Sequence, residues 1–288
     1  MKKVLGLFTL SFFTTALFAQ NTILWSVQKT GSEKIAYVLG SFHQMGNSFV
    51  DEKPLIKELL LKSDLAIFES VEDKYEKIIS VMLKRTDDFS YRESLNKQDV
   101  GFLEKYTADW KVPISKQKPA ELLVKLQQEY VKMSCGTVKS TDTTAHMDDY
   151  LLSLAQKNGI QVQGLESFAD QFEAISSING EDFSWDKAKD IIHEWVINFQ
   201  DDKNRKKICA LAESYIKMRL DYQFNTRCAE NDEVLLKRNE KWMPLIIESI
   251  QQNNSVIVIV GLYHLYGECG IISQLRKEGY IVNPVKLK

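Results

Sequence analysis

Two short segments, far apart in this chain, share a pattern of residues that could do chemistry. Residues 37–46 and 259–267 each hold an apolar run, then Gly, any residue, an aromatic residue and His, with a second Gly three residues later. Their histidines, His43 and His264, are two of only four in the chain. An apolar run followed by Gly is typical of a buried strand that ends in a tight turn. Because α/β sheets bind ligands at the carboxyl ends of their strands, the pattern predicts that His43 and His264 line one shared site.

Two glutamates repeat in a similar way. Glu69 and Glu166 each follow a short segment that is expected to form a strand, and each precedes a serine. Two imidazoles with one or two carboxylates are a competent ligand set for a divalent transition metal, and such an ion activates water and polarises a carbonyl. We therefore predict His43, Glu69, Glu166 and His264 as metal ligands. The repetition also raises the possibility of two related halves, although the similarity is too short to establish a duplication.

Each of these residues has a structural alternative. A single His after a strand is more often a hydrogen-bonded structural residue than a ligand, and loop carboxylates usually face solvent or cap a helix. The other two histidines fit such roles. His146 lies at a polar helix start and is interpreted as a surface residue. His193 lacks the second His of a zincin motif, which indicates a helix residue beside the core.

Arg238 is the next candidate, at the edge of an apolar stripe on an expected helix. An Arg there could clamp a carboxylate or stabilise an oxyanion. The alternative is a surface salt bridge with Asp232 or Glu233. Asn239 is interpreted as a cap or as a residue that orients a neighbour. The chain has no nucleophile elbow, phosphate-binding loop or dinucleotide fingerprint.

The first nineteen residues are typical of a secretory signal peptide. A start with two lysines precedes a mostly apolar stretch, and Ala19 is a small residue suited to cleavage before Gln20. The alternative is an uncleaved anchor, but the apolar run is shorter than the ~20 residues of a membrane helix. We therefore expect an exported protein, periplasmic or secreted, with residues 20–288 as its mature domain.

Composition limits the classes of protein that the mature chain could be. An apolar content of 44% is ordinary for a globular protein with one substantial core. No second apolar run approaches the length of a membrane helix, so we expect no stable membrane span. Without the two N-terminal lysines the formal net charge changes from −2 to −4, and no basic face is evident, which argues against nucleic acid as a partner. The oligomeric state is not indicated.

All four cysteines, Cys135, Cys209, Cys228 and Cys269, lie in the part expected to be exported. An oxidising compartment permits disulfides, and four cysteines allow three connectivities. A pair among the first three is plausible, because they fall in the helical middle of the chain. Cys269 lies five residues after His264, where a role beside the site is conceivable. A free buried cysteine is the alternative for each.

Short apolar runs predict strands, and segments with helical spacing fill the space between them. The expected strands are residues 23–28, 35–40, 64–69, 161–165, 255–260 and 280–285. The expected helices are residues 51–62, 73–84, 97–106, 119–134, 143–157, 169–177, 186–199 and 271–278, with two or more within 210–251, broken near 225–227 or by Pro244. The first two strands are expected to form a hairpin. The predicted fold is α/β (α+β): a single domain with a central mixed β-sheet flanked by helices and a large helical middle insertion.

In this order, the motifs make the chain resemble the TraB/GumN family, whose animal relatives are the TIKI metalloproteases. The matching residues extend over nearly the whole mature chain, and their ordered combination is specific although no single piece is. They are Leu24-Trp25, Gly40-Ser41-Phe42-His43, Phe68-Glu69, Gly164-Leu165-Glu166-Ser167, Gln171, Leu236, Arg238-Asn239, Trp242 and residues 260–267. The resemblance implies a fold related to the erythromycin esterase and ChaN-like proteins.

The resemblance also implies roles for the site residues. His43, Glu69 and His264 would hold a metal or activate water, with Glu166 close by and Arg238 binding the substrate or its developing charge. The TIKI enzymes are manganese- or cobalt-dependent proteases that trim the amino terminus of Wnt proteins. The implied cofactor is therefore a divalent transition metal (Mn, Co or Zn), and the implied partner is a peptide or small-molecule substrate.

The chain departs from the family pattern in its second motif. Leu262 and Tyr263 stand where small residues are usual, which would narrow the pocket. Cys269 replaces an acidic residue that is usual near this point, so that an additional ligand could be missing.

Three functions follow from these residues and from the resemblance, which suggests the second through the esterase relatives and the third through the ChaN-like proteins. The first is an exported metal-dependent hydrolase, peptidase-like, with His43, Glu69, His264 and Arg238 as its catalytic residues. The second is a metal-free, esterase-like hydrolase in which a His–Glu pair activates water. The third is a non-catalytic protein that binds haem or a metal, for which Tyr263 or Tyr266 could supply a phenolate ligand.

Overall fold

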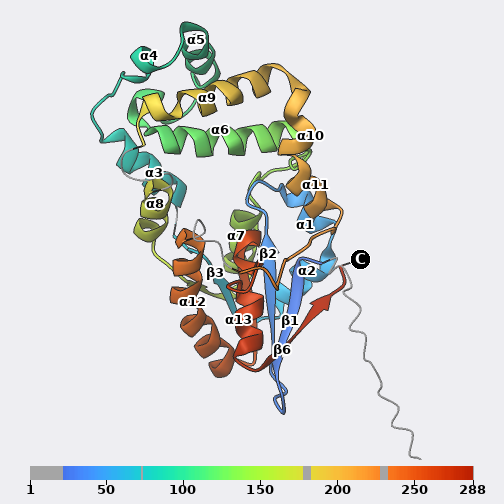
Figure 1. Cartoon of the computed structure of the whole chain (residues 1–288). Coiled ribbons are helices and arrows are strands. Elements are labelled where there is room, and N and C mark those ends of the chain that lie inside the picture. The colour runs from blue at the N-terminus through green and yellow to red at the C-terminus, as the bar shows by residue number, and fades with distance from the viewer. Residues whose placement is uncertain (1–21, 73, 178–182, 228–232, 288) are drawn as a thin grey trace, which may run out of the picture.

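A six-stranded mixed β-sheet forms the centre of the computed structural model, which describes residues 22–72, 74–177, 183–227 and 233–287 (Figure 1). Its strands are β1 (Leu24–Lys29), β2 (Ile35–Ser41), β3 (Leu65–Phe68), β4 (Gln161–Gly164), β5 (Ser255–Gly261) and β6 (Tyr280–Val285). They lie in the order β4-β3-β5-β2-β1-β6. β4, β3, β5 and β2 run parallel, whereas β1 is antiparallel to both of its neighbours. The predicted strands and mixed sheet are confirmed.

The sequence explains why these strands pair as they do. β5 is a β-branched run that is buried from Val256 onward, as expected for a parallel strand covered on both faces. It lies between β3 and β2, so the carboxyl ends of all three strands meet at one edge. The predicted hairpin is present as β1 and β2, and Gly31 adopts a φ of 78° in its turn, a conformation that glycine adopts without strain.

Helices cover both faces of this sheet (Figure 1). The helices next to the sheet are α1 (Asn47–Asp51), α2 (Pro54–Leu61), α7 (Met147–Lys157), α11 (Ala210–Ile216), α12 (Glu233–Gln252) and α13 (Ile271–Lys277), with the short 3-10 helix η4 (Leu262–Leu265). α12 packs against β5 and α13, whereas α2 and α7 pack against each other beside β3 and β4. In the described residues no helix is long and apolar enough to cross a membrane.

The large helical insertion lies beyond one end of the sheet (Figure 1). Its elements are α3 (Lys74–Leu83), α4 (Tyr91–Ser94), α5 (Lys97–Tyr106), η1 (Ile114–Lys116), α6 (Pro119–Ser134), α8 (Phe168–Ser177), α9 (Trp185–Gln200), η2 (Asp202–Asn204) and α10 (Arg205–Ile208). α4, α5, α6 and α9 enclose an apolar cluster of their own, which includes Leu103, Leu126 and Ile192. The insertion therefore has packing that does not depend on the sheet.

Some predicted helix boundaries differ from the structure. The helix predicted from residue 143 begins only at Met147, because residues 139–144 form a loop that hydrogen-bonds to Asn47 and Ser48 at the start of α1. The break predicted within 210–251 includes residues 217–227, whereas Pro244 lies inside α12 without ending it. Pro244 is exposed, so the carbonyl group that loses its hydrogen bond can face water.

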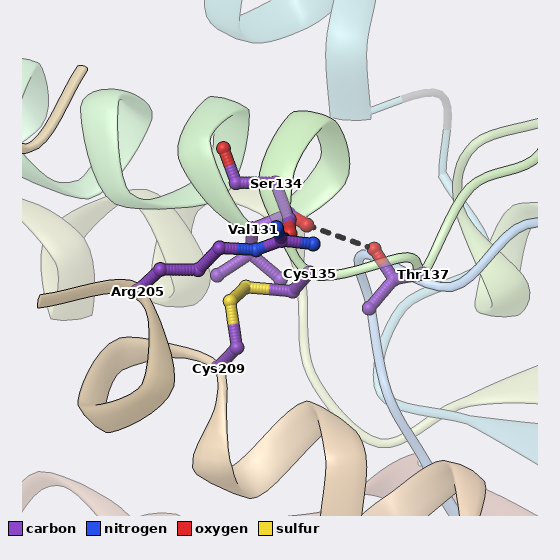
Figure 2. The surroundings of a disulfide bond; sticks show 6 residues. All are labelled: Val131, Ser134, Cys135, Thr137, Arg205 and Cys209. Atoms are coloured by element: carbon purple, nitrogen blue, oxygen red, sulfur yellow. Dashed lines mark hydrogen bonds between the residues drawn. A yellow bond between two sulfur atoms is a disulfide. The ribbon is translucent and has the colours of Figure 1, made fainter. Parts of the chain in front are cut away.

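A disulfide joins Cys135, at the end of α6, to Cys209, at the start of α11 (Figure 2). This pair agrees with the expectation of a bridge in the helical middle. Cys269 is also disulfide-bonded, so the free-cysteine alternative is wrong for it, and Cys228 lies outside the described residues. The residues before Gln20 are outside them as well, so the predicted signal peptide stays a prediction.

Candidate functional site

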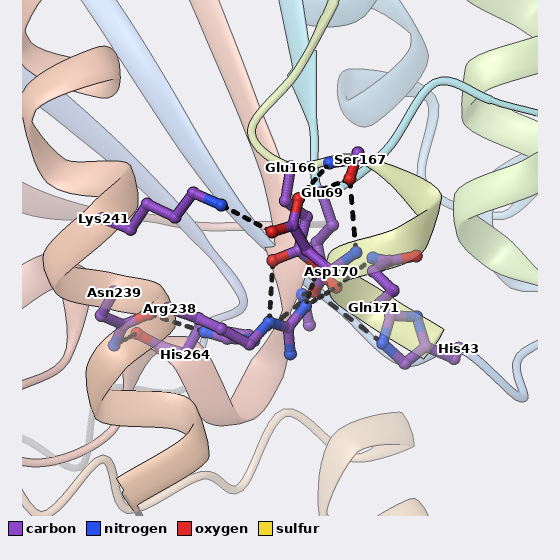
Figure 3. Close-up of polar contacts among 11 residues, drawn as sticks. His43, Glu69, Glu166, Ser167, Asp170, Gln171, Arg238, Asn239, Lys241 and His264 are labelled. Atoms are coloured by element: carbon purple, nitrogen blue, oxygen red, sulfur yellow. Dashed lines mark hydrogen bonds and ion pairs between the residues drawn. The ribbon is translucent and has the colours of Figure 1, made fainter. Parts of the chain in front are cut away.

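Four strand ends deliver the predicted residues to one place. His43 follows β2, Glu69 follows β3 directly, Glu166 follows β4, and His264 lies in η4 after β5. The backbone continues the β3–β4 pairing past the strands, because the Glu166 N–H donates to the Glu69 carbonyl (3.0 Å). Figure 3 shows these side chains converging with Arg238. The sequence reasoning was right that these strand ends are neighbours.

Glu69 lies at the centre of the group. Its Oε1 accepts a hydrogen bond from the Gly261 N–H (2.7 Å) and lies 3.9 Å from His43 Nε2 and 3.7 Å from His264 Nε2. Its Oε2 accepts from Arg238 Nη2 (2.7 Å) and from Gln171 Nε2 (3.3 Å). Both histidines therefore face the same oxygen of a buried carboxylate.

The orientation of His264 is set by Asn239. The Asn239 amide donates to the carbonyls of His264 (3.2 Å) and Cys269 (2.9 Å), so its Oδ1 is the atom that faces His264 Nδ1 at 2.6 Å. Nδ1 must then carry the proton, which leaves Nε2 as an acceptor. The lone pair of Nε2 points at the carboxylate of Glu69, and two acceptors at 3.7 Å need a donor or a cation between them.

His43 has a different partner, Asp148 in the first turn of α7. Asp148 Oδ2 lies 2.6 Å from His43 Nδ1, and its Oδ1 accepts a hydrogen bond from the Ser41 hydroxyl (2.6 Å). A carboxylate accepts hydrogen bonds, so His43 Nδ1 carries a proton and Nε2 points toward Glu69. This is the arrangement in which a carboxylate orients an imidazole that acts as a base.

Arg238 joins the two glutamates. Its Nε and Nη2 donate to Glu166 (3.1 and 2.7 Å), and Nη2 also donates to Glu69 (2.7 Å). The guanidinium lies 4.6 Å from the ring centre of Trp242, whose ring is 4.3 Å from that of His264. The predicted alternative, a surface salt bridge, does not describe Arg238. Among the described residues its Nη1 makes no hydrogen bond, so this nitrogen is a donor that a substrate oxygen could use.

Gly261 leaves space at this point. Its φ of −54° is one that any residue can adopt, so a glycine is needed here only because it has no side chain. A Cβ atom here would lie 3.0 Å from His43 Nε2 and 3.1 Å from Glu69 Oε1. The methyl group of an alanine would therefore enter the space between the His43 imidazole and the Glu69 carboxylate.

Burial and charge set the protonation of the central pair. Burial raises the pKa of Glu69, but the charges of His264, His43 and Arg238 and the Gly261 N–H outweigh it and leave the pKa below its usual range. Burial lowers the pKa of His264 to about 3, with Arg238 and His43 acting in the same direction and Glu69 opposing them. We regard Arg238 as the charge that keeps Glu69 ionised, because an imidazole with this pKa is neutral near pH 7.

The donor atoms of the site are of the chemical types that bind a divalent transition metal. Two imidazole Nε2 acceptors and one carboxylate oxygen are donors of the right chemistry. In spacing the site is wider than a bound ion requires, since ligand atoms about 2.1 Å from one ion lie about 3.0–3.5 Å apart, against the 3.7 and 3.9 Å observed. Within the described residues no three or more His, Cys, Asp or Glu side chains lie close enough together to bind one metal ion as they stand. Glu166 is occupied by Arg238 instead of facing the histidines.

The remaining histidines lie elsewhere. His193, on α9, contacts the buried carboxylate of Asp99 at 3.0 Å, with half of its side chain exposed, in agreement with a helix residue beside the core. His146 directly precedes α7, and burial is the main cause that lowers its pKa. Its side chain is partly exposed, so His146 lies at the surface, as predicted, but is not fully open to solvent.

The residues that depart from the family pattern are also placed. Leu262 is buried and packs over Gly40, where an added Cβ would meet it at 3.0 Å. Tyr263 is 57% exposed. The backbone carbonyl of Cys269 accepts from Asn239, so this position supports the orientation of His264.

A mixed sheet whose parallel strand ends gather two histidines, two glutamates and an arginine defines an α/β protein with a polar site at its carboxyl edge. A model of the TraB/PrgY/gumN family matches residues 23–284, and the chain therefore belongs to the TraB/PrgY/gumN family. No curated protein and no solved structure matches the chain.

Proposed function

We propose that this protein is an exported hydrolase that uses a water molecule held between His43, His264 and Glu69, most simply with a peptide as substrate. The observation that carries the proposal is the convergence of two imidazole Nε2 atoms on Glu69 Oε1, at 3.9 and 3.7 Å. Three acceptors around one point require a proton donor or a cation there. A water molecule supplies two protons and, once one is removed, a nucleophile.

In the proposed reaction His43 is the general base. The Asp148 carboxylate holds His43 Nδ1 and stabilises the imidazolium that forms when Nε2 takes a proton from water. Neutral His264 and ionised Glu69 orient the same water. Arg238 offers Nη1 to the substrate oxygen that gains negative charge, and its other nitrogens are fixed by Glu69 and Glu166.

Metal dependence is the first form of this proposal. His43, Glu69 and His264 would hold a manganese, cobalt or zinc ion, which would supply Lewis-acid polarisation and a lower pKa of water. The second form is metal-free and is favoured by the spacing, because 3.7 and 3.9 Å exceed the separation of two ligand atoms on one ion, about 3.0–3.5 Å. The Asp148–His43 contact suits either form, since metal-ligating histidines also donate to carboxylates.

A haem-binding function has less support. Burial raises the pKa of Tyr263, and it raises that of Tyr266 to about 12. Each phenol would have to lose its proton to bind the iron, and burial makes that loss more costly.

The test of the hydrolase uses the chain from Gln20 to Lys288. After chelation, manganese, cobalt and zinc are added back separately, metal content is measured, and cleavage of a fluorogenic peptide library and of simple esters is followed. We expect hydrolysis to fall at least ~100-fold in His43→Ala, the usual range for loss of a general base.

His193→Ala is the matched control, because His193 is also half exposed and also contacts an aspartate. Its hydrolysis should stay unchanged. Equal activity in His43→Ala and the parent chain overturns the proposal. Full activity after exhaustive chelation, with no stoichiometric metal, replaces the first form by the second.

Export is tested separately. The basic and apolar start of the chain supports removal of residues 1–19. Protein recovered from the periplasm or the medium should begin at Gln20 on N-terminal sequencing, whereas an intact Met1 in the cell interior overturns this part of the proposal.

A further inference from the structure

Tyr215, on α11, lies directly behind the His43 turn. Its side chain is fully buried, and its hydroxyl donates to the carbonyl of Gly40 (2.8 Å). The same oxygen lies 3.4 Å from Met147 Sδ, and the ring centre lies 5.3 Å from that of Phe42. One side chain therefore touches the end of β2 and the start of α7.

Each residue that Tyr215 contacts is next in sequence to one of the three hydrogen-bonded polar residues Ser41, His43 and Asp148. Gly40 and Phe42 alternate along the chain with Ser41 and His43, and Met147 directly precedes Asp148. Ser41 and His43 contact Asp148, whereas Phe42 packs on Tyr215. The hydrogen bonds Ser41–Asp148 and His43–Asp148 join the same two segments on the opposite side.

The helix that carries Tyr215 is itself tied to these segments. Cys209 directly precedes α11 and is bonded to Cys135, where the chain leaves α6 for the loop that leads to α7 (Figure 2). The loop is anchored at Thr137, whose hydroxyl donates to Val131 and whose carbonyl accepts from the Gly46 N–H (2.8 Å). The disulfide therefore links the start of α11 to the loop that leads to α7 and that hydrogen-bonds to the segment after β2.

We propose that Tyr215 is a positioning residue that holds the Asp148 carboxylate on His43 Nδ1 by fixing the spacing of β2 and α7 from behind. The inference deepens the proposed function and rests on it in one respect, the role of His43 as a base. Loss of the Tyr215 hydroxyl releases Gly40 and leaves the ring packing on Phe42 in place. The hydrogen bond between His43 and Asp148 should then open more often, with no change in charge at the site.

The test compares Tyr215→Phe with Tyr222→Phe. Tyr222 is buried too, and its hydroxyl donates to a backbone carbonyl, that of Thr22, at 2.7 Å. Both variants lose one buried hydroxyl, so similar decreases in melting temperature are expected. The specific readout is exchange with water of the His43 Nδ1 proton, measured by NMR on protein labelled with ¹⁵N-histidine.

For Tyr215→Phe we expect at least tenfold faster exchange and a kcat that falls tenfold or more at an unchanged KM. For Tyr222→Phe we expect parental values for both. Unchanged exchange in Tyr215→Phe, or equal acceleration in both variants, overturns the positioning role. Faster exchange in Tyr215→Phe alone, with no effect on hydrolysis, supports that role and counts against His43 as the base.

Discussion

The two Gly-x-aromatic-His turns match in sequence but differ in what surrounds each histidine. The His43 side chain is 44% exposed and its Nδ1 contacts a carboxylate. The side chain of His264 is 3% exposed and its Nδ1 contacts the amide of Asn239. A carboxylate stabilises a charged imidazole, whereas a buried amide suits a neutral one. The repeat sets where each ring lies, and the neighbours set what the ring can do with a proton.

The glycines of the two turns differ in the same way. An added Cβ at Gly40 would meet the apolar side chains of Leu265 and Leu262, at 2.8 and 3.0 Å, whereas at Gly261 it would meet His43 and Glu69. The second glycines differ as well. Gly46 makes room for the carboxylate of Asp142, and Gly267 adopts a φ of 71°. The first glycine of each turn therefore has a different role: Gly40 allows close apolar packing, and Gly261 leaves the space between His43 and Glu69 open.

The largest effect on activity is expected when the carboxylate that contacts His43 is removed. Asp148→Asn keeps the shape of the side chain but no longer stabilises a charged His43. We expect kcat to fall about 10³–10⁴-fold, as when the aspartate of a catalytic triad becomes asparagine, with little change in urea unfolding. Activity within tenfold of the parent would show that the two histidines do not differ in the way proposed.

A smaller effect is expected when the reaction space is filled. Gly261→Ala should lower kcat/KM about 10²–10³-fold, the cost of displacing reacting groups by about 1 Å or removing a key donor. Gly40→Ala is its counterpart in the other turn and should mainly cost stability, about 1–3 kcal/mol from overpacking. Urea unfolding with kinetics on both variants checks this, and a reversed assignment of the two effects would contradict it.

The smallest effect is expected when His264 is given a carboxylate neighbour like that of His43. Asn239→Asp places a charge where the amide donates to two carbonyls. The lost donors and the buried charge should cost about 3 kcal/mol of unfolding free energy. Calorimetry on Asn239→Asp and Asp148→Asn compares the two exchanges. If Asp148→Asn proves the less stable variant, our account of the second turn is wrong.

Sequence reasoning located the strand ends because buried apolar runs and glycines are local signals. The same reasoning missed Asp148. Asp148 and Asp149 both lie in the first turn of α7, where acidic residues are common for helix stability alone, and nothing local distinguishes them. The rotation of α7 decides which of the two reaches His43, and that rotation depends on how the loop after Cys135 docks near Gly46. Asn239 was predicted to cap a helix or to orient a neighbour, and that neighbour, His264, could not be named from the sequence because it follows 25 positions later.

The position of β5 between β2 and β3 has a consequence for when the site can exist. β2 and β3 come early in the chain but do not pair with each other, and the strand that joins them is residues 255–261. Such a long-range pairing forms late, after the entropy of closing a large loop has been overcome. A chain that lacks residues 255–261 therefore leaves His43 and Glu69 unaligned, and the polar site is complete only once the carboxyl-terminal strands have paired.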